Sequence, residues 1–148
     1  MNVNPADSLK QVMLAAAEIA ARNNCEYLTL ECLLMALLQD EDLIETLQDN
    51  EVDLAGITKE ISDYISNELP KSTEGNPPRE TKSVERVLNR AFGQAMFYGQ
   101  NQVHSLDVLL SILFEKNSWV AVLLKKYSVT KKSLSSTGNR SSGPEERK

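Results

Sequence analysis

Residues 28–38 read LTLECLLMALL, and residues 103–114 read VHSLDVLLSILF. In both stretches a hydroxyl residue, Thr29 or Ser105, is followed by Leu, by an acid and then by an apolar run of helical length. A hydroxyl at a helix N-cap accepts a hydrogen bond from an unpaired amide, and an acid in the first turn complements the helix dipole. The two stretches therefore predict helices that begin at about Thr29 and Ser105. Neither has Glu or Gln three residues after the hydroxyl, so neither predicts a full capping box.

The repeat extends beyond these two helices. Leu106 lies 76 residues after Leu30, and the same offset aligns residues 9–24 with residues 85–100. Solenoid repeats have periods of roughly 20 to 50 residues and occur in longer arrays, whereas only two copies are present here. We therefore expect an internally duplicated globular domain.

Length, composition and charge limit the class of protein. A chain of 148 residues with 41% hydrophobic and 5% aromatic residues fits one domain with a mostly aliphatic core. A net charge of −5 argues against binding to nucleic acid or to an anionic membrane surface. No apolar run approaches the roughly 18 residues of a membrane span, and the N-terminus lacks the features of a signal peptide. We expect a soluble, cytoplasmic protein.

Helical periodicity and helix-end signals predict an all-α fold with two sets of four helices. The expected ranges are about 7–22, 30–39, 40–47 and 55–67, followed by 83–99, 106–114, 118–126 and 129–134. The candidate caps are Asp7 or Ser8 for the first helix and Ser83 for the fifth.

The expected domain boundaries follow from these ranges and from the composition between them. The polar, Pro-rich stretch 70–80 predicts an exposed connector without a helix. Residues 136–148 contain no apolar side chain, so we expect a flexible linker or tail. The expected folded domain is 1–135, and its parts are repeat one at about 8–67, a connector at 68–82 and repeat two at about 83–134.

The residue types offer little for catalysis or for metal binding. Cys25 and Cys32 could pair, but free structural thiols are expected in a reducing cytosol. His104 is the only histidine and adjoins a predicted cap, so neither a metal set nor a catalytic triad is expected. Glu26 and Glu31 could be paired acid/base carboxylates, yet both lie around a helix N-terminus, where acids are stabilised anyway. We expect a non-catalytic binding module without a cofactor.

The two repeated stretches resemble the twin motifs of the Clp N-terminal domain, which stands at the front of AAA+ unfoldases. The resembling segments are TLECLLMALL at 29–38 and SLDVLLSILF at 105–114. Further matches to the ClpA type are VDL at 52–54, the Pro-containing connector, RVLNRA at 86–91 and LLKK at 123–126. The resemblance covers about residues 8–134. It implies eight helices in two pseudo-symmetric four-helix repeats, as the periodicity also does.

The resemblance also implies a function. In ClpA-like proteins this domain is joined by a flexible linker to two ATPase modules that unfold substrates into the ClpP peptidase. It docks the adaptor ClpS, which delivers substrates with destabilising N-terminal residues, and unfolded substrates are the other expected partner. The ATPase is expected beyond Lys148, with the tail from Ser135 as the start of the linker. The isolated domain is expected to be a monomer and the full-length protein a hexamer.

The adaptor face that the resemblance implies would use Glu26, Glu31, Thr81 and Arg90. Acids at one helix start and an Arg on a nearby helix can form charge-assisted hydrogen bonds with a partner. The simpler alternatives are that Glu31 only complements a helix dipole, that Thr81 is a loop or cap residue, and that Arg90 only solvates a helix face.

Several alternatives to this interpretation stay open. Some relatives carry His residues before the first motif, where metal binds, but this chain has Asn23, Asn24 and Cys25 there, so no metal site is carried over. The connector differs from that of the ClpC type, which weakens the case for an adaptor other than ClpS. A freestanding regulatory protein that never joins an ATPase would be distinguished only by the sequence after Lys148. An all-helical enzyme would need a pocket with a perturbed titratable pair.

Direct binding of unfolded substrate is a further possibility. It would need apolar side chains such as Tyr27, Phe97 and Tyr98 to stay exposed where the repeats meet. We expect these side chains instead to complete the core.

Overall fold

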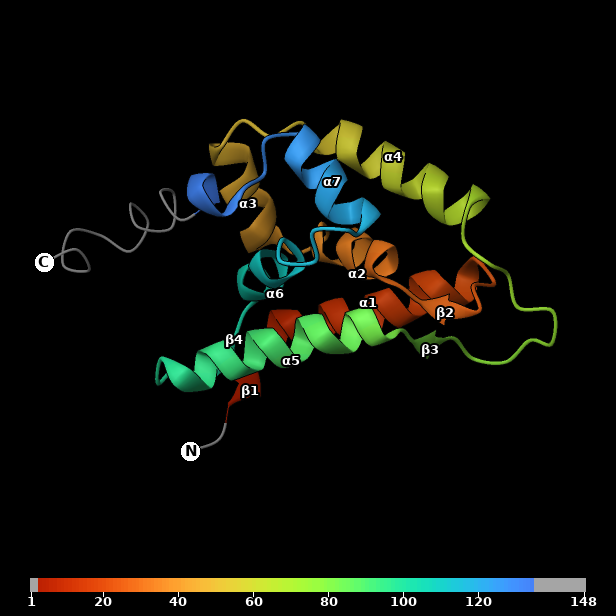
Figure 1. Cartoon of the computed structure of the whole chain (residues 1–148), viewed down its shortest axis with the longest axis horizontal. Helices are drawn as coiled ribbons and strands as arrows, with labels where there is room; N and C mark the ends of the chain where they lie inside the picture. Colours follow the sequence, from red (N-terminus) through yellow and green to blue (C-terminus); the bar gives the residue numbers. More distant parts are fainter. Residues whose placement is uncertain (1–2, 135–148) are drawn as a thin grey trace, which may run out of the picture.

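The computed structural model describes residues 3–134, and helices dominate this part of the chain (Figure 1). The seven longer helices are α1 (Asp7–Arg22), α2 (Leu30–Leu37), α3 (Glu41–Asp49), α4 (Leu54–Asn67), α5 (Lys82–Phe97), α6 (Ser105–Ile112) and α7 (Trp119–Lys126). Residues 131–134 add one more helical turn. The predicted all-α fold of eight helices in two repeats is thus confirmed. The predicted linker at 136–148 lies outside the described residues.

Four strands of two residues each accompany the helices, and the sequence did not predict them. They are β1 (Asn4–Pro5), β2 (Tyr27–Leu28), β3 (Arg79–Glu80) and β4 (Gln102–Val103). β1 pairs with β4 and β2 pairs with β3, both in parallel. β1 precedes α1 and β4 follows α5, so their pairing joins the start of α1 to the end of α5. β2 follows α1 and β3 precedes α5, so their pairing joins the end of α1 to the start of α5. The two long helices therefore run antiparallel.

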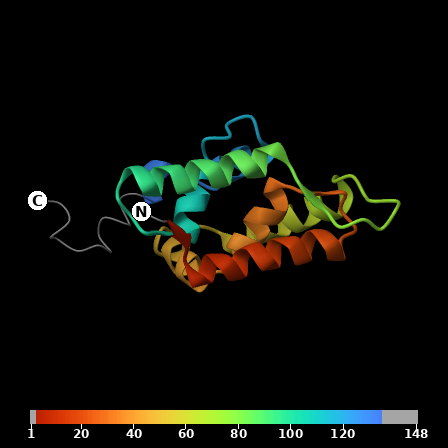
Figure 2. The same ribbon diagram turned by 90° about the horizontal axis from the view of Figure 1, so that it is seen from below.

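The two repeats enclose their most apolar helices, α2 and α6. α1 and α5 run along opposite sides of the molecule, with α2 and α6 between them (Figure 2). Seven of the eight residues of α2 are buried. Full burial of a large aliphatic side chain contributes about 1.5–3 kcal/mol, so the core supplies most of the driving force for folding. None of the helices in residues 3–134 combines the length and hydrophobicity needed to cross a bilayer.

Side-chain contacts between α4 and the region of α7 also join the repeats. The Tyr64 and Trp119 rings stack with centroids 4.0 Å apart. The Tyr127 hydroxyl donates a hydrogen bond of 2.5 Å to Glu60 Oε2. This bond, aided by partial desolvation, raises the pKa of Tyr127 to about 12. The repeats therefore form one packed unit.

The expected N-cap of α2 is confirmed, but that of α6 is wrong. The Thr29 hydroxyl accepts from the Cys32 amide at 3.5 Å. In repeat two the cap position is His104, whose backbone N–H donates to the Asp107 carboxylate at 2.8 Å. Ser105 does not cap, because its buried hydroxyl donates to Oδ2 of buried Asp40 at 2.5 Å. Its hydroxyl thus joins the repeats instead.

The expected caps of α1 and α5 are also wrong. α1 follows Ala6, which has no capping side chain, so neither Asp7 nor Ser8 is the cap. α5 follows Thr81, whose hydroxyl accepts from the Val84 amide, and Ser83 lies inside the first turn. Strand pairing explains where α1 and α5 begin. The amides of Ala6 and Thr81 donate to carbonyls of the opposite repeat, Val103 at 2.9 Å and Leu28 at 3.2 Å, so each helix begins where its strand ends.

The expected role of the aromatic residues at the end of α5 is wrong too. Phe97 is 82% exposed and Tyr98 is 73% exposed, so they do not complete the core. The last turn of α5 extends beyond α6 (Figure 1). Tyr27 is half-buried. Cys25 and Cys32 are both buried and free.

The hydrogen bond between the repeats predicts a stability effect. Replacing Ser105 with Ala leaves the buried Asp40 Oδ2 without its donor, which should lower the free energy of unfolding by about 1–3 kcal/mol. Urea denaturation followed by Trp119 fluorescence measures this change. Exposed Ser66 in α4 provides the matched control, Ser66→Ala, which should change stability by less than about 0.5 kcal/mol. Equal stability of the two variants would contradict the structural role of the bond.

Candidate docking surface

The β2–β3 ribbon brings two of the predicted site residues together from opposite repeats. Exposed Glu26 precedes β2, and its carbonyl accepts from the Arg79 amide at 3.3 Å. Thr81 follows β3, and its amide donates to the Leu28 carbonyl at 3.2 Å. Backbone hydrogen bonds thus hold Glu26 and Thr81 at the same end of the molecule, although 55 residues separate them in sequence.

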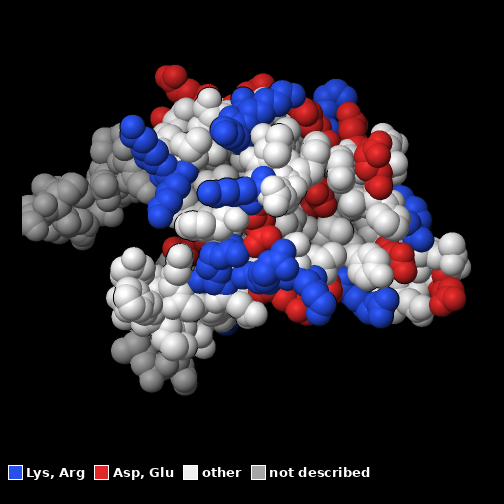
Figure 3. All heavy atoms as spheres, in the orientation of Figure 1, with Lys and Arg blue, Asp and Glu red and all other residues white. Residues whose placement is uncertain are grey.

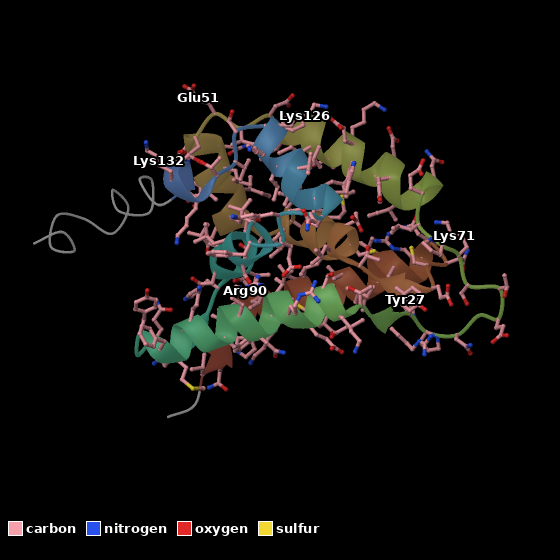
Figure 4. All side chains as sticks on the ribbon, viewed as in Figure 1. Tyr27, Glu51, Lys71, Arg90, Lys126 and Lys132 are labelled. Carbon is pink, nitrogen blue, oxygen red and sulfur yellow. The ribbon has the colours of Figure 1, made fainter. Side chains whose placement is uncertain are left out.

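The connector forms one wall of this surface. The Lys71 ammonium donates to the carbonyls of Asn23 at 3.0 Å and Ile65 at 2.9 Å, and so joins the ends of α1 and α4. The Ser72 amide donates to the Asn24 carbonyl at 2.7 Å. A polar hollow remains between the connector and Glu26. Figure 4 shows Lys71 and Tyr27 at this end of the fold. The described residues between α4 and α5 contain no helix, and the two ends of this connector are bonded to repeat one through Lys71, Ser72 and Arg79.

A cation–π contact adds to the same surface. The Arg79 guanidinium lies 5.6 Å from the centroid of the Tyr27 ring. Arg79 is exposed and Tyr27 is half-buried. The β2–β3 ribbon therefore presents an acid, a base and an aromatic ring to solvent within a few residues. This combination suits a polar protein partner.

Glu31 does not lie on a polar face, contrary to the expectation from the sequence. It is in the first turn of α2 and is only 8% exposed. The neighbouring Tyr64 of α4 has a raised pKa, mainly because of its own burial and, to a smaller extent, because of the negative charges of Glu31 and Glu68. The sequence could not reveal this burial, because α4 covers α2 only in the folded chain. Little of the Glu31 carboxylate is available to a partner.

Thr81 is the cap of α5, and its hydroxyl accepts from the Val84 amide at 3.2 Å. Thr81 is therefore a cap residue, as the simpler of the two alternatives from the sequence had it. Its side chain is half-buried, so a partner can still contact part of it.

Arg90 lies away from the other three residues. Nine residues separate it from Thr81 along α5, which is about 14 Å of helix, and Figure 4 shows it near the middle of α5. Its guanidinium donates to the Ser111 carbonyl and to Glu115 Oε2, both at 2.8 Å. With 27% of its side chain exposed, Arg90 secures α5 to the end of α6. The simpler alternative, that Arg90 only solvates a helix face, is therefore wrong, and its proposed role in adaptor binding stays a prediction.

The sequence did not predict the ion network around Arg90. Glu115 accepts from Arg86 at 2.8 Å as well as from Arg90. Hydrogen bonds from Arg86 and Arg90 hold the pKa of the Glu115 carboxyl below its ordinary value, although partial desolvation acts in the opposite direction. The spacing of Arg86 and Arg90 indicates a shared helix face. Nothing in the sequence identified Glu115, which follows α6, as their common partner.

The exposed Glu26 and Arg79 side chains of this surface can form ion pairs and hydrogen bonds. Within residues 3–134, no group of three or more His, Cys, Asp or Glu side chains could hold a metal ion. Cys25 is buried, and its burial raises the pKa of the thiol. A buried, protonated thiol is a poor nucleophile.

Comparisons with known proteins agree with this architecture. Residues 4–137 match the family model described as the Clp repeat (R) N-terminal domain. The chain is 31% identical over 127 residues to a protein named ClpA homolog from Fuscovulum blasticum. The match covers 84% of this chain and 16% of that relative, so the chain spans a small part of the relative's length.

Solved structures resemble the fold across most of the chain. The Hsp104 N-terminal domain from Candida albicans has a TM-score of 0.81 at 13% identity, covering 95% of this chain and 92% of its own. The N-terminal domain of the ClpV1 ATPase from the E. coli EAEC Sci1 T6SS has a TM-score of 0.75 at 18% identity, covering 88% and 81%. At these identities the likeness shows the fold alone.

The ion network predicts a pH-dependent stability effect. Because the folded-state pKa of Glu115 is lowered, its contribution is present above its ordinary pKa of about 4.5 and is lost as pH falls through the folded-state value. Glu115→Gln should lower the free energy of unfolding by about 1 kcal/mol at pH 7, and this difference should shrink toward about pH 3. Urea denaturation at a series of pH values measures it, with exposed Glu45→Gln as the control. A difference that does not change with pH would contradict the assigned charge pair.

Proposed function

Because this chain belongs to the Clp repeat N-terminal domain family, we propose that it docks adaptors and substrates for a ClpA-like ATP-dependent unfoldase. In this proposal the whole protein feeds the ClpP peptidase, and the domain binds a ClpS-like adaptor that carries substrates with destabilising N-terminal residues. The domain itself contributes binding and no catalysis. The 31% identity to a ClpA homolog favours the ClpA type.

One observation carries the proposal. The β2–β3 ribbon sets exposed Glu26 beside Thr81 through backbone bonds between the two repeats. A partner that binds this surface contacts both repeats at once, and its position is fixed by rigid backbone. Such a preorganised polar surface needs little reordering when a partner binds.

The four proposed docking residues are expected to contribute unequally. Glu26 should contribute most, because its side chain is exposed and no side-chain partner occupies it within residues 3–134. Thr81 adds a half-buried contact next to it. Glu31 is nearly buried, and the Arg90 guanidinium is already bound by Ser111 and Glu115. For these two we propose that the adaptor contacts only their exposed edges.

Charge reversal at Glu26 tests the docking proposal. Titration calorimetry of the chain with a ClpS-like adaptor from the same source should show saturable binding near one to one. Glu26→Lys should weaken it about tenfold or more, because a complementary charge becomes a like charge. Glu45→Lys is the matched control, since Glu45 is exposed on α3 at the other end of the fold. Circular dichroism checks that both variants are folded.

Two results would count against adaptor docking at the ribbon. If Glu26→Lys and Glu45→Lys bind equally well, the docking surface lies elsewhere. If the unchanged chain does not bind at high concentration, ClpS-like docking is wrong, and direct contact with substrate becomes the leading function.

Direct binding of unfolded substrate is the second candidate function, and the end of α5 favours it. Met96, Phe97 and Tyr98 are 58%, 82% and 73% exposed, and the two aromatic rings meet edge to face at 5.2 Å. An exposed apolar cluster of this kind can hold unfolded chain weakly.

Replacing both rings tests the second function. The double variant Phe97→Ser, Tyr98→Ser should weaken binding to permanently unfolded, carboxymethylated α-lactalbumin about threefold or more, because it removes exposed apolar contact area. Stability should change little, since both side chains face solvent. Fluorescence anisotropy of the labelled substrate measures binding, and exposed Leu14→Ser on α1 serves as the control. Equal binding by the control and the double variant would remove this cluster from the function.

A further inference from the structure

A groove with an apolar floor and a basic rim lies between the end of α6, α7 and residues 129–131. Its volume is about 640 Å³, which falls in the range of ligand-binding clefts. Its floor includes Leu113, Phe114 and Val122, and its rim carries Lys116, Lys125 and Lys131. This Lys-rimmed groove lies on a different side of repeat two from the β2–β3 ribbon (Figure 1).

The charge of the groove is opposite to that of the chain. The chain has a net charge of −5, yet no Asp or Glu is among the residues that line the groove. Within residues 3–134, none of the three rim lysines forms an ion pair with a carboxylate. Figure 3 shows Lys and Arg side chains over α5, α7 and the last helical turn on this face, with acidic atoms beside the Arg side chains of α5. The local field thus attracts anions.

Two apolar side chains of the groove floor, Phe114 and Val122, are exposed to solvent, and the Phe114 ring is held by neighbouring cations. Val122 is 59% exposed and Phe114 is 44% exposed, so both present apolar surface to solvent within the groove. The Phe114 ring has two cations near it, Lys131 Nζ at 5.4 Å and the Arg90 guanidinium at 5.5 Å. Because Ser111 and Glu115 fix the Arg90 guanidinium, the ring is supported from the side of α5.

We propose that the Lys-rimmed groove binds an acidic, apolar peptide segment of a partner protein. Leu or Phe side chains of the segment enter the groove and cover Phe114 and Val122. Asp or Glu side chains on either side of them pair with the rim lysines. The apolar contact supplies affinity, and the charges select an acidic segment over a neutral or basic one.

A synthetic peptide in which Leu and Phe alternate with Asp and Glu is the probe. Fluorescence anisotropy of the labelled peptide with the full chain should give saturable binding that weakens with added salt. One comparison peptide carries Lys in place of every acid, and a second carries Ser in place of every Leu and Phe. Both should bind about tenfold more weakly or worse, because each lacks one of the two required contacts.

Variants of the chain localise the binding. Val122→Asp and Lys125→Glu should each weaken binding about tenfold, and circular dichroism should show that both are folded, since both positions are exposed. Leu14→Asp is the matched control, because Leu14 is 67% exposed on α1 away from the groove, and it should change binding less than about twofold. The double variant Phe97→Ser, Tyr98→Ser should also bind normally, which separates the groove from the aromatic cluster of α5.

Each contrary result overturns the proposal. Equal binding of the Lys-containing peptide would show that the rim charges do not select the ligand. Equal binding of the Ser-containing peptide would show surface attraction without entry into the groove. Absence of binding, or an equal loss in Leu14→Asp, would remove the groove as the site. Adaptor binding should be unaffected by Val122→Asp, so failure of this proposal and failure of ribbon docking can be told apart.

Discussion

The apolar character of α2 is the constraint on which the structure depends. Seven of its eight residues are buried, so no single layer of neighbouring helices can cover it. It contacts α1 and α4 of its own repeat and also α5, α6 and α7 of the other. Each large aliphatic side chain that stays buried contributes about 1.5–3 kcal/mol. Separation of the repeats would expose much of this surface, and for that reason the duplicated sequence forms one domain.

The contacts between the repeats fix the position of the proposed docking surface. The two-residue strands contribute few hydrogen bonds, yet they set where α1 and α5 begin through the amides of Ala6 and Thr81. They also place Glu26 next to Thr81. A surface made from both repeats exists only when the shared core is intact, so the proposed docking should depend on the stability of the core.

The sequence predicted the features that a local period encodes, whereas local end signals misplaced the N-caps of α1, α5 and α6. Helical spacing identified the helices, and the continuous apolar run of α2 and α6 predicted burial. Two-residue strands have no period that could reveal them. Ser105 appeared to be a cap because its competing partner, Asp40, is 65 residues away. The sequence also could not reveal that α4 covers Glu31 or that Glu115 binds Arg90, because these contacts form only in the folded chain. The groove is likewise formed by residues from the end of α6, from α7 and from residues 129–131, which come together only in the folded chain.

Chemical-shift mapping of a ClpS-like adaptor on the isotopically labelled chain tests most directly the claim that the meeting point of the repeats is the docking surface. The largest amide shifts should lie at residues 26–31 and 79–82, in segments on both sides of the β2–β3 pairing, with smaller changes along α5 as far as Arg90. Shifts confined to one side of that pairing, or centred on the Lys-rimmed groove or on the aromatic end of α5, would contradict this claim.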